Sequence, residues 1–88
     1  MLFSEVFLDR SHAKSIRHFY QELRSEMKPD EVIPFLFAKH TIDPSEQHQL
    51  RDERSYLRKN ETILDIIMWG PKQGFDNLLI ALENTSQS

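Results

Sequence analysis

Apolar side chains recur along this chain at helical spacing, and two such runs follow each other in its second half. The first run places its apolar residues on one helical face: Ile63, Leu64, Ile67 and Met68. The second repeats at i, i+3, i+4 and i+7: Phe75, Leu78, Leu79 and Leu82. Gly70 and Pro71 lie between them. Glycine ends a helix by adopting positive φ, and proline is tolerated in a first helical turn. The pattern therefore predicts one helix that ends at Trp69 and another from about Pro71 to Asn84.

A long helix is also predicted near the start of the chain. Its apolar residues are three or four positions apart: Ala13, Ile16, Tyr20, Leu23 and Met27. Asp9 or Ser11 can cap its N-terminus, and the helix ends before Pro29 because proline disfavours helical geometry in the residue that precedes it. Ahead of this helix lies a short apolar patch, which is either a helical turn or a docked arm: Leu2, Phe3, Val6 and Phe7.

The next predicted helix covers about residues 31 to 40. Its apolar residues are Val32, Ile33, Leu36 and Phe37. Asp30 is the candidate N-cap, since its short acidic side chain can accept a hydrogen bond from the first turn. Pro34 lacks a backbone N–H and is tolerated early in a helix, so it indicates a start at or just before Ile33.

The strongest local signal for a helix start is the segment Asp43-Pro44-Ser45-Glu46. An acid at the N-cap, a proline at the first helical position and a glutamate at N3 form the pattern of a capping box. We therefore predict a helix that begins at Pro44. Because Leu50 is its main apolar residue, we expect this helix to be short and exposed on most sides. The polar residues 51–55 contain the turn into the helix that ends at Trp69.

Together these patterns predict an all-α fold of five helices plus the N-terminal apolar patch, without period-two alternation or internal repeats. The chain has 88 residues, enough for one small domain. Its 39% hydrophobic and 28% charged residues are typical of globular proteins, and the absence of cysteine excludes disulfides and thiolate metal sites. The chain start lacks the basic residues of a signal peptide, and no apolar run approaches the roughly 18 residues that span a bilayer. We expect a cytoplasmic protein.

Residue types that serve in catalysis or metal binding are present but lack the required spacing. Four histidines show neither the i, i+4 pairing nor the acidic companions of a zinc site: His12, His18, His40 and His48. Most acidic residues occur at helix starts or beside basic residues, which capping explains, and no glycine-rich phosphate loop is found. We therefore expect no enzymatic activity, no cofactor and no metal. Trp69, at the end of an apolar helix, is assigned to the core.

Charged residues are grouped by helix rather than mixed evenly along the chain. A basic group belongs to the first helix and the start of the fourth: Arg10, Lys14, Arg17, Arg54, Arg58 and Lys59. An acidic group belongs to the starts of the second and third: Asp30, Glu31, Asp43 and Glu46. If the first and fourth helices are neighbours and the second and third lie opposite, the domain can bind a copy of itself, or a relative, basic face to acidic face. The alternative is that these are ordinary solvated charges. A net charge of −3 argues against nucleic acid as a partner.

Four segments follow one another in a distinctive order: Asp30-Glu31-Val32-Ile33-Pro34-Phe35-Leu36, then Ile42-Asp43-Pro44-Ser45-Glu46, then Thr62-Ile63-Leu64-Asp65-Ile66-Ile67 ending in Trp69-Gly70-Pro71, then Gly74-Phe75-Asp76-Asn77-Leu78-Leu79-Ile80-Ala81-Leu82-Glu83. This order resembles the caspase recruitment domain (CARD) of the death-fold superfamily over about residues 10 to 85. The resemblance implies an antiparallel helical bundle of the Greek-key, death-fold type, without a cofactor. It also implies binding to another CARD, in a caspase, in an adaptor or in a second copy, with stacking into oligomers in apoptotic or inflammatory signalling. It places the basic partner surface at Arg17, Arg58 and Lys59, and the acidic one at the acidic group.

The chain departs from that family in two places. A sixth helix normally follows the fifth, whereas this sequence stops at Ser88, and Tyr56 and Asn60 dilute the basic cluster at the start of the fourth helix. Either the chain is a fragment of a larger protein or the bundle is incomplete. For an incomplete bundle we hypothesise that the N-terminal apolar patch fills the groove of the missing helix or packs on a second chain. The predicted division of the chain is an apolar segment, a CARD-like domain and a polar tail: residues 1–9, 10–85 and 86–88.

A second hypothesis is a small all-α structural or regulatory domain, including a helical DNA-binding module. A recognition helix for DNA needs several basic residues along one face, and the fifth helix has only Lys72 near its start. The charge pattern therefore favours an adaptor or scaffold that recruits partners without catalysis.

Overall fold

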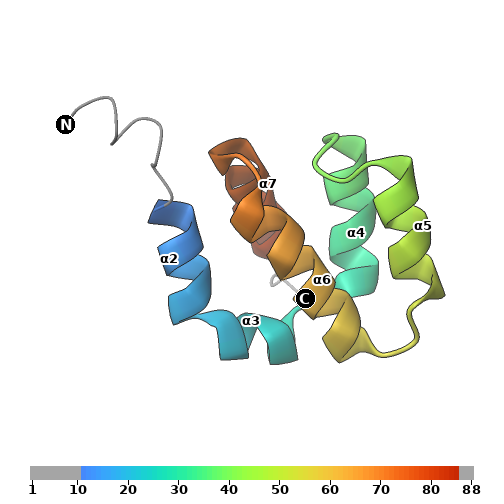
Figure 1. The fold of residues 1–88 in the computed structure, drawn as a ribbon, viewed down its shortest axis with the longest axis horizontal. Coiled ribbons are helices and arrows are strands. Elements are labelled where there is room, and N and C mark those ends of the chain that lie inside the picture. Colours follow the sequence, from blue (N-terminus) through green and yellow to red (C-terminus); the bar gives the residue numbers. More distant parts are fainter. Residues whose placement is uncertain (1–10, 86–88) are drawn as a thin grey trace.

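The computed structural model describes residues 11–85, and the regular secondary structure in this range is entirely helical (Figure 1). The helices are α2 Ser11–His18, α3 Tyr20–Glu26, α4 Pro29–Ala38, α5 Pro44–Asp52, α6 Tyr56–Trp69 and α7 Lys72–Thr85. The prediction of an all-α fold is confirmed. The predictions for the N-terminal apolar patch, for Arg10 and for the polar tail concern residues outside the described range.

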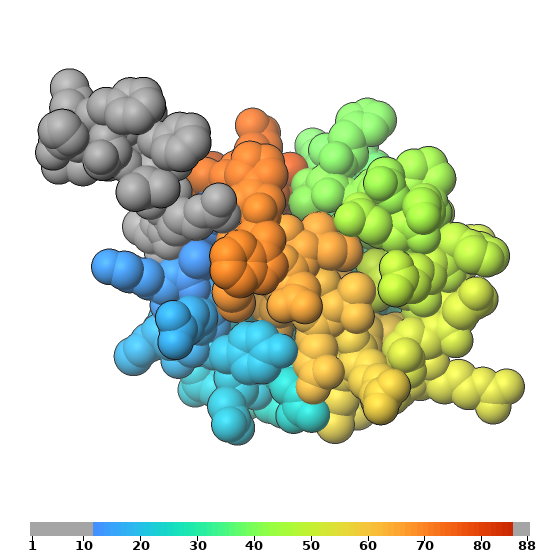
Figure 2. All heavy atoms as spheres, viewed as in Figure 1, coloured from blue at the N-terminus to red at the C-terminus, as the bar shows by residue number. Residues whose placement is uncertain are grey.

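Helix α6 lies at the centre of the bundle. It packs against α2, α3, α4 and α7, while α4 packs against both α5 and α7. Figure 1 shows α6 running obliquely between α2 and α3 on one side and α4 and α5 on the other, and Figure 2 shows the surface of the same face. The most deeply buried apolar side chains are Ile16, Val32, Leu36, Ile42, Leu50, Ile63, Leu64, Ile67 and Leu78. Burial of each contributes about 1.5 to 3 kcal/mol, so this core is the main source of stability.

The predicted first helix is divided into α2 and α3 at Phe19, whose backbone has φ −105° and ψ 18°. The hydrogen bond from Phe19 N to Ser15 O, 3.1 Å long, continues the helical pattern into the break. The other end of α3 is tied to α6. Asn60 of α6 is fully buried and donates from Nδ2 to the carbonyl oxygens of Arg24 at 2.8 Å and Met27 at 3.0 Å. These bonds satisfy carbonyls at the end of α3 and hold it against α6.

Helix α4 begins earlier than predicted, at Pro29, with Lys28 as its N-cap. Asp30 therefore lies in the first turn rather than at the cap, and Pro34 lies inside the helix rather than near its start. An internal proline removes one helical hydrogen bond and disfavours the helix by about 3 kcal/mol. Pro29 and Val32 are nevertheless buried in the bundle. Packing of this first turn against the core explains why the helix extends through Pro34, whose own side chain is exposed.

The end of α4 is closed by a Schellman motif that the sequence patterns did not predict. His40 adopts the left-handed conformation with φ 62°, and it is the one non-glycine residue with positive φ in the described range. Its N–H bonds to Phe37 O at 3.0 Å, and the N–H of Thr41 bonds to Leu36 O at 2.9 Å. These are the two hydrogen bonds of that motif. Glycine is the usual residue at this position, which is why histidine gave no signal.

The predicted capping box at the start of α5 is confirmed. The Oδ1 atom of Asp43 accepts from the backbone N–H of Glu46 at 2.7 Å, and Glu46 Oε1 accepts from the N–H of Asp43 at 2.9 Å. Ser55 caps α6 in a similar way, because its Oγ accepts from the N–H of Arg58 at 3.3 Å. Both helix starts follow from residues within one helical turn of the cap.

The break between α6 and α7 lies at Gly70 and Pro71 as predicted, but the reason given for Gly70 was wrong, and so was the separate assignment of Trp69 to the core. Gly70 has φ −94°, so positive φ does not explain it. Instead, a Cβ at this position would lie 2.9 Å from the carbonyl oxygen of Ile66, which leaves no room for a side chain. Trp69, which the pattern assigned to the core, is 69% exposed. The buried stripe of α6 is made of Asn60, Ile63, Leu64 and Ile67, and position 69 falls outside it.

Candidate interaction surfaces

The first and fourth predicted helices are neighbours, because α2 lies against the C-terminal half of α6. Between them lies a shallow surface depression of about 560 Å³, which we call the α2–α6 depression. Its residues are Ala13, Arg17, Tyr20, Asp65, Met68 and Trp69. Burial of Tyr20 raises the pKa of its phenol, and the carboxylates of Glu61 and Asp65 raise it further, while Arg24 lowers it. The depression therefore contains an exposed tryptophan beside an arginine and an aspartate.

The basic group is divided into two parts by the length of α6. Lys14 and Arg17 lie on α2, beside the C-terminal end of α6, whereas Arg54 and Arg58 lie at its N-terminal end. A helix of 14 residues is about 20 Å long, so these pairs cannot form one compact patch. All four side chains are exposed, and none makes an ion pair within residues 11–85. They are available to a partner.

Lys59 and Asp30, which the sequence placed on opposite faces, pair with each other. Lys59 Nζ lies 3.1 Å from Asp30 Oδ1, and the two side chains are 16% and 86% exposed respectively. The contact forms because the N-terminal ends of α4 and α6 lie together. The second helix therefore does not lie opposite the fourth at this end of the bundle, as the charge pattern required. The predicted basic and acidic groups meet there instead.

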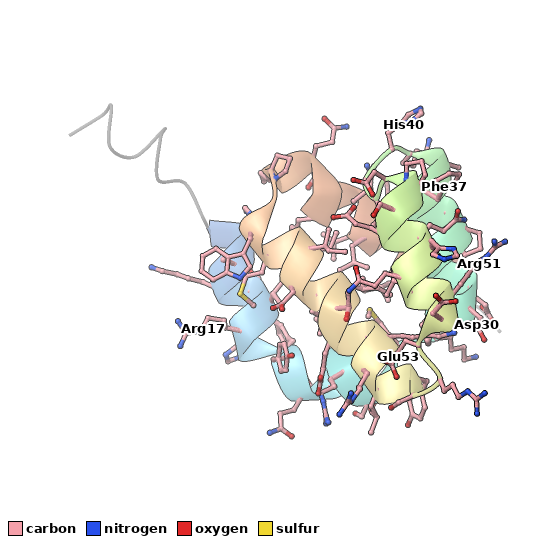
Figure 3. The ribbon with its side chains drawn as sticks, turned by 45° about the vertical axis from the view of Figure 1, so that its right-hand side comes forward. Arg17, Asp30, Phe37, His40, Arg51 and Glu53 are labelled. Atoms are coloured by element: carbon pink, nitrogen blue, oxygen red, sulfur yellow. The ribbon has the colours of Figure 1, made fainter. Side chains whose placement is uncertain are left out.

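The acidic group is also divided, because α4 and α5 form an antiparallel pair. Asp30 and Glu31 lie at the start of α4, whereas Asp43 and Glu46 lie beyond its other end, where they form the capping box. The separation is about 15 Å for a helix of 10 residues. In Figure 3, Asp30 lies at the start of α4 and His40 lies beyond its other end. Arg17 lies on the side of the molecule away from Asp30. Acidic charge is thus presented at two corners of the α4–α5 pair.

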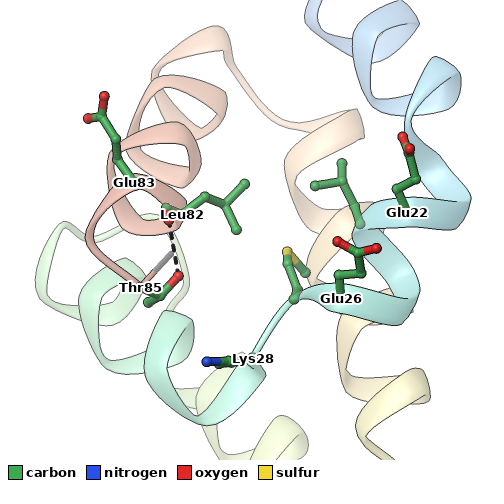
Figure 4. Close-up of a pocket in the computed structure, with 8 residues that line it drawn as sticks. Glu22, Glu26, Lys28, Leu82, Glu83 and Thr85 are labelled. Atoms are coloured by element: carbon green, nitrogen blue, oxygen red, sulfur yellow. Dashed lines mark hydrogen bonds between the residues drawn. The ribbon is translucent and has the colours of Figure 1, made fainter. Parts of the chain in front are cut away.

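The sequence patterns did not identify the residues of the groove that lies between α3 and α7. This α3–α7 groove has a volume of about 370 Å³ and an apolar lining of Leu23, Met27 and Leu82 (Figure 4). Its polar residues are Glu22, Glu26, Lys28, Glu83 and Thr85. No spacing pattern could reveal it, because it combines residues from the two ends of the described chain.

The buried polar side chains link distant segments of the bundle. His12 is 4% exposed, and its Nε2–H donates to the carbonyl oxygen of Gly70 at 3.1 Å. Asn77 donates from Nδ2 to Thr41 Oγ1 at 2.9 Å. Within residues 11–85, no three side chains of the metal-binding types form a group that could hold an ion. The roles that geometry assigns to His12 and Asn77 are therefore structural.

Comparison with protein-family models, with curated proteins and with solved structures gives no match to this chain. None of the helices in the described part of the chain has both the length and the apolar character needed to cross a membrane. The surfaces described above are therefore the basis for assigning a function.

Proposed function

We propose that this chain is a protein–protein interaction module of the CARD type, with a death-fold arrangement of its helices. In this proposal it binds another CARD, or a second copy, through complementary charged surfaces and assembles signalling partners in apoptosis or inflammation. It acts in the cytoplasm as an adaptor or scaffold, without catalysis or a cofactor. The starts of α4 and α5 and the end of α6 coincide with three of the segments that carry the resemblance.

The observation that carries the proposal is the set of exposed basic side chains that make no ion pair among residues 11–85. Arg54 and Arg58 stand at the start of α6, and neither makes an ion pair within the described residues. Glu31, exposed at the start of α4, makes none either. Asp43 and Glu46 use one carboxylate oxygen each for capping, which leaves the second oxygen for a partner. Surface charges without local partners favour contact with a complementary surface.

The contact we propose is heterologous, since a basic corner of one molecule binds an acidic corner of the next. Contacts of this kind use two different surfaces, so they can continue into rings or filaments. Helix α7, which a DNA-binding module would require to be basic, offers only Lys72, and its Nζ lies 3.9 Å from Asp76. This observation lends no support to DNA binding.

The test is the molecular mass of the full chain in solution as a function of concentration, at about 50 mM and about 500 mM salt. Because exposed charge pairs are screened at high ionic strength, assembly should occur at low salt and reverse at high salt. Arg58→Glu should weaken assembly about tenfold or more, since one well-placed interfacial charge contributes about 1 to 3 kcal/mol.

Arg51→Glu is the matched control, because Arg51 is exposed on α5 and makes no ion pair among the described residues. It changes the net charge by the same amount at a residue that belongs to neither the basic nor the acidic group. If both variants weaken assembly equally, the effect comes from net charge alone. Assembly that does not depend on the salt concentration would contradict the charged contact.

A further inference from the structure

A row of apolar side chains follows one side of α3 and continues across its start. The N–H of Leu23 bonds to Phe19 O at 2.9 Å, and the N–H of Met27 bonds to Leu23 O at 3.0 Å. Phe19, Leu23 and Met27 therefore lie on successive helical turns and on one side. Phe19 is 50% exposed, whereas Met27 is buried. The row thus begins at the surface and descends into the α3–α7 groove.

A second row lies on α7 and runs in the same direction. His12 of α2 lies near Phe75, with ring centroids 5.9 Å apart, and further along Leu23 and Leu82 line the same groove. Between these two contacts α7 presents Leu79, which is 47% exposed and one turn from Leu82. The α3–α7 groove is lined by Leu23, Met27 and Leu82. Helical spacing puts Phe19 one turn before Leu23 and Leu79 one turn before Leu82, so an apolar trough about 12 Å long, the rise of eight helical residues, is expected along the two rows.

Helices α3 and α7, which flank this trough, leave it open. Helix α3 packs mainly against α2 and α6 rather than against α7. Figure 4 shows Leu82 of α7 directed across the groove toward α3. A groove with apolar residues on both walls, and with half-exposed apolar residues one helical turn beyond them, is typical of a site for a helix, which inserts residues at i, i+3, i+4 and i+7.

Charge indicates what kind of helix fits. Glu22 and Glu26 are exposed one turn apart on α3, and neither makes an ion pair within residues 11–85. Glu83 and Lys28 also line the groove, but both already have interactions within the chain, so the charge open to a partner is that of Glu22 and Glu26. The rim is therefore acidic, and a helix with basic residues beside its apolar face is complementary to it.

We infer that the trough between α3 and α7 is a docking site for an amphipathic helix of a partner protein, with basic residues flanking its apolar stripe. The site is separate from the charged corners proposed above, so the two can fail independently. The N-terminal apolar patch fits it less well, because residues 1–9 contain Glu5 and Asp9 and no basic side chain. A partner helix would bury Phe19 and Leu79 and place its basic residues against Glu22 and Glu26.

The test uses a synthetic amphipathic peptide of about 18 residues, or five helical turns, with a leucine stripe flanked by lysine and arginine. The comparison peptide has the same stripe with glutamate in place of every basic residue. Each is titrated into the full ¹⁵N-labelled chain, with amide shifts to locate the site and fluorescence anisotropy to measure Kd. We expect the basic peptide to bind at least about tenfold more tightly and to shift amides of α3 and α7.

Variants of the rim and the wall sharpen this test. Glu22→Lys and Glu26→Lys should each weaken the basic peptide several-fold, and Leu79→Ser should weaken it further, since an exposed side chain is changed without disturbing the core. Asp65→Lys is the matched charge control, because Asp65 is exposed on α6 outside the groove and makes no ion pair within the described residues. It should leave binding unchanged.

Several results would overturn the inference. Equal binding of both peptides, or amide shifts away from α3 and α7, would remove the case for a basic helix at this site. Peptide binding that appears only after deletion of residues 1–9 would identify that segment as the natural occupant. Self-association abolished by Leu79→Ser would identify a second copy instead.

Discussion

Two short helices, α3 and α5, are stabilised in opposite ways. Helix α5 has 9 residues with Leu50 as its buried residue, and it begins with a capping box made by its own segment. Helix α3 has 7 residues, none of them buried, and no side-chain cap at its N-terminus. Its C-terminal carbonyls are satisfied by Asn60 of α6. Self-contained capping makes α5 a local structure, whereas α3 depends on the rest of the bundle.

This difference bears on where partners can bind. The α4–α5 corner is closed by two capping motifs and presents charge, while the α3 side leaves Phe19 and Leu79 exposed beside a groove. A helix whose hydrogen bonds and packing are supplied by other elements loses its structure when those contacts open, whereas a helix with its own cap and buried residue does not depend on them alone. We therefore expect α3 to separate from α6 before the α4–α5 pair loses its structure.

Replacement of Asn60, which holds α3 against α6, should have the largest effect on the free energy of unfolding. Asn60→Ala leaves two carbonyl groups at the end of α3 without their donor, and at least one of these hydrogen bonds is buried. We expect the free energy of unfolding to fall by about 2 to 4 kcal/mol in urea denaturation, with loss of amide protection in α3. Asn77→Ala removes one hydrogen bond, to Thr41, and should lower it by about 1 kcal/mol. Equal losses would contradict the special role of Asn60.

Removal of the capping box tests the local stabilisation of α5. Asp43→Ala should lower the free energy of unfolding by about 1 kcal/mol, since it deprives the N–H of Glu46 of its acceptor. Asp52→Ala is the control at the other end of α5, where the exposed carboxylate lies 3.5 Å from His48. Its effect should be below about 0.5 kcal/mol. Thermal melts at high salt would separate this effect from self-association, and a loss near zero for Asp43→Ala would refute the importance of the cap.

His40 offers a gain in stability at the same corner. A side chain in the left-handed region is unfavourable, and glycine avoids that strain, so His40→Gly should raise the free energy of unfolding by about 0.5 to 1 kcal/mol. Lys39→Gly, one residue earlier with φ −90°, should lower it instead. In urea denaturation, the two variants should change the free energy of unfolding in opposite directions. If both lower it, the contacts of the His40 side chain stabilise the fold by more than its backbone strain destabilises it.

The pair formed by Lys59 and Asp30 should have the smallest effect. Asp30 is 86% exposed, so solvent screens the attraction, and a double-mutant cycle with alanine should give a coupling energy below about 0.5 kcal/mol. The coupling should fade between low and high salt. A coupling above about 1 kcal/mol would mean that this ion pair helps to fix α4 against α6.

The basic and acidic groups were identified from the sequence, and most of their described members are exposed. Their division between opposite ends of α6 and of α4 could not be identified in that way, because it depends on how helices cross. The same holds for the pairing of Lys59 with Asp30, 29 positions apart, and of Arg24 with Glu61, 37 positions apart. The α3–α7 groove joins residues still further apart.

The sequence by itself determined the all-α class, the start of α5 and the end of α6, because caps and apolar periodicity act within about one or two helical turns. The tertiary structure decided the attachment of α3 to α6 through Asn60, the early start of α4 at Pro29 and the exposure of Trp69. In each of these cases a local preference was outweighed, or left undecided, by packing against residues distant in the chain. Burial of apolar area and satisfaction of buried carbonyls depend on neighbours in space, which is why only the folded chain could settle them.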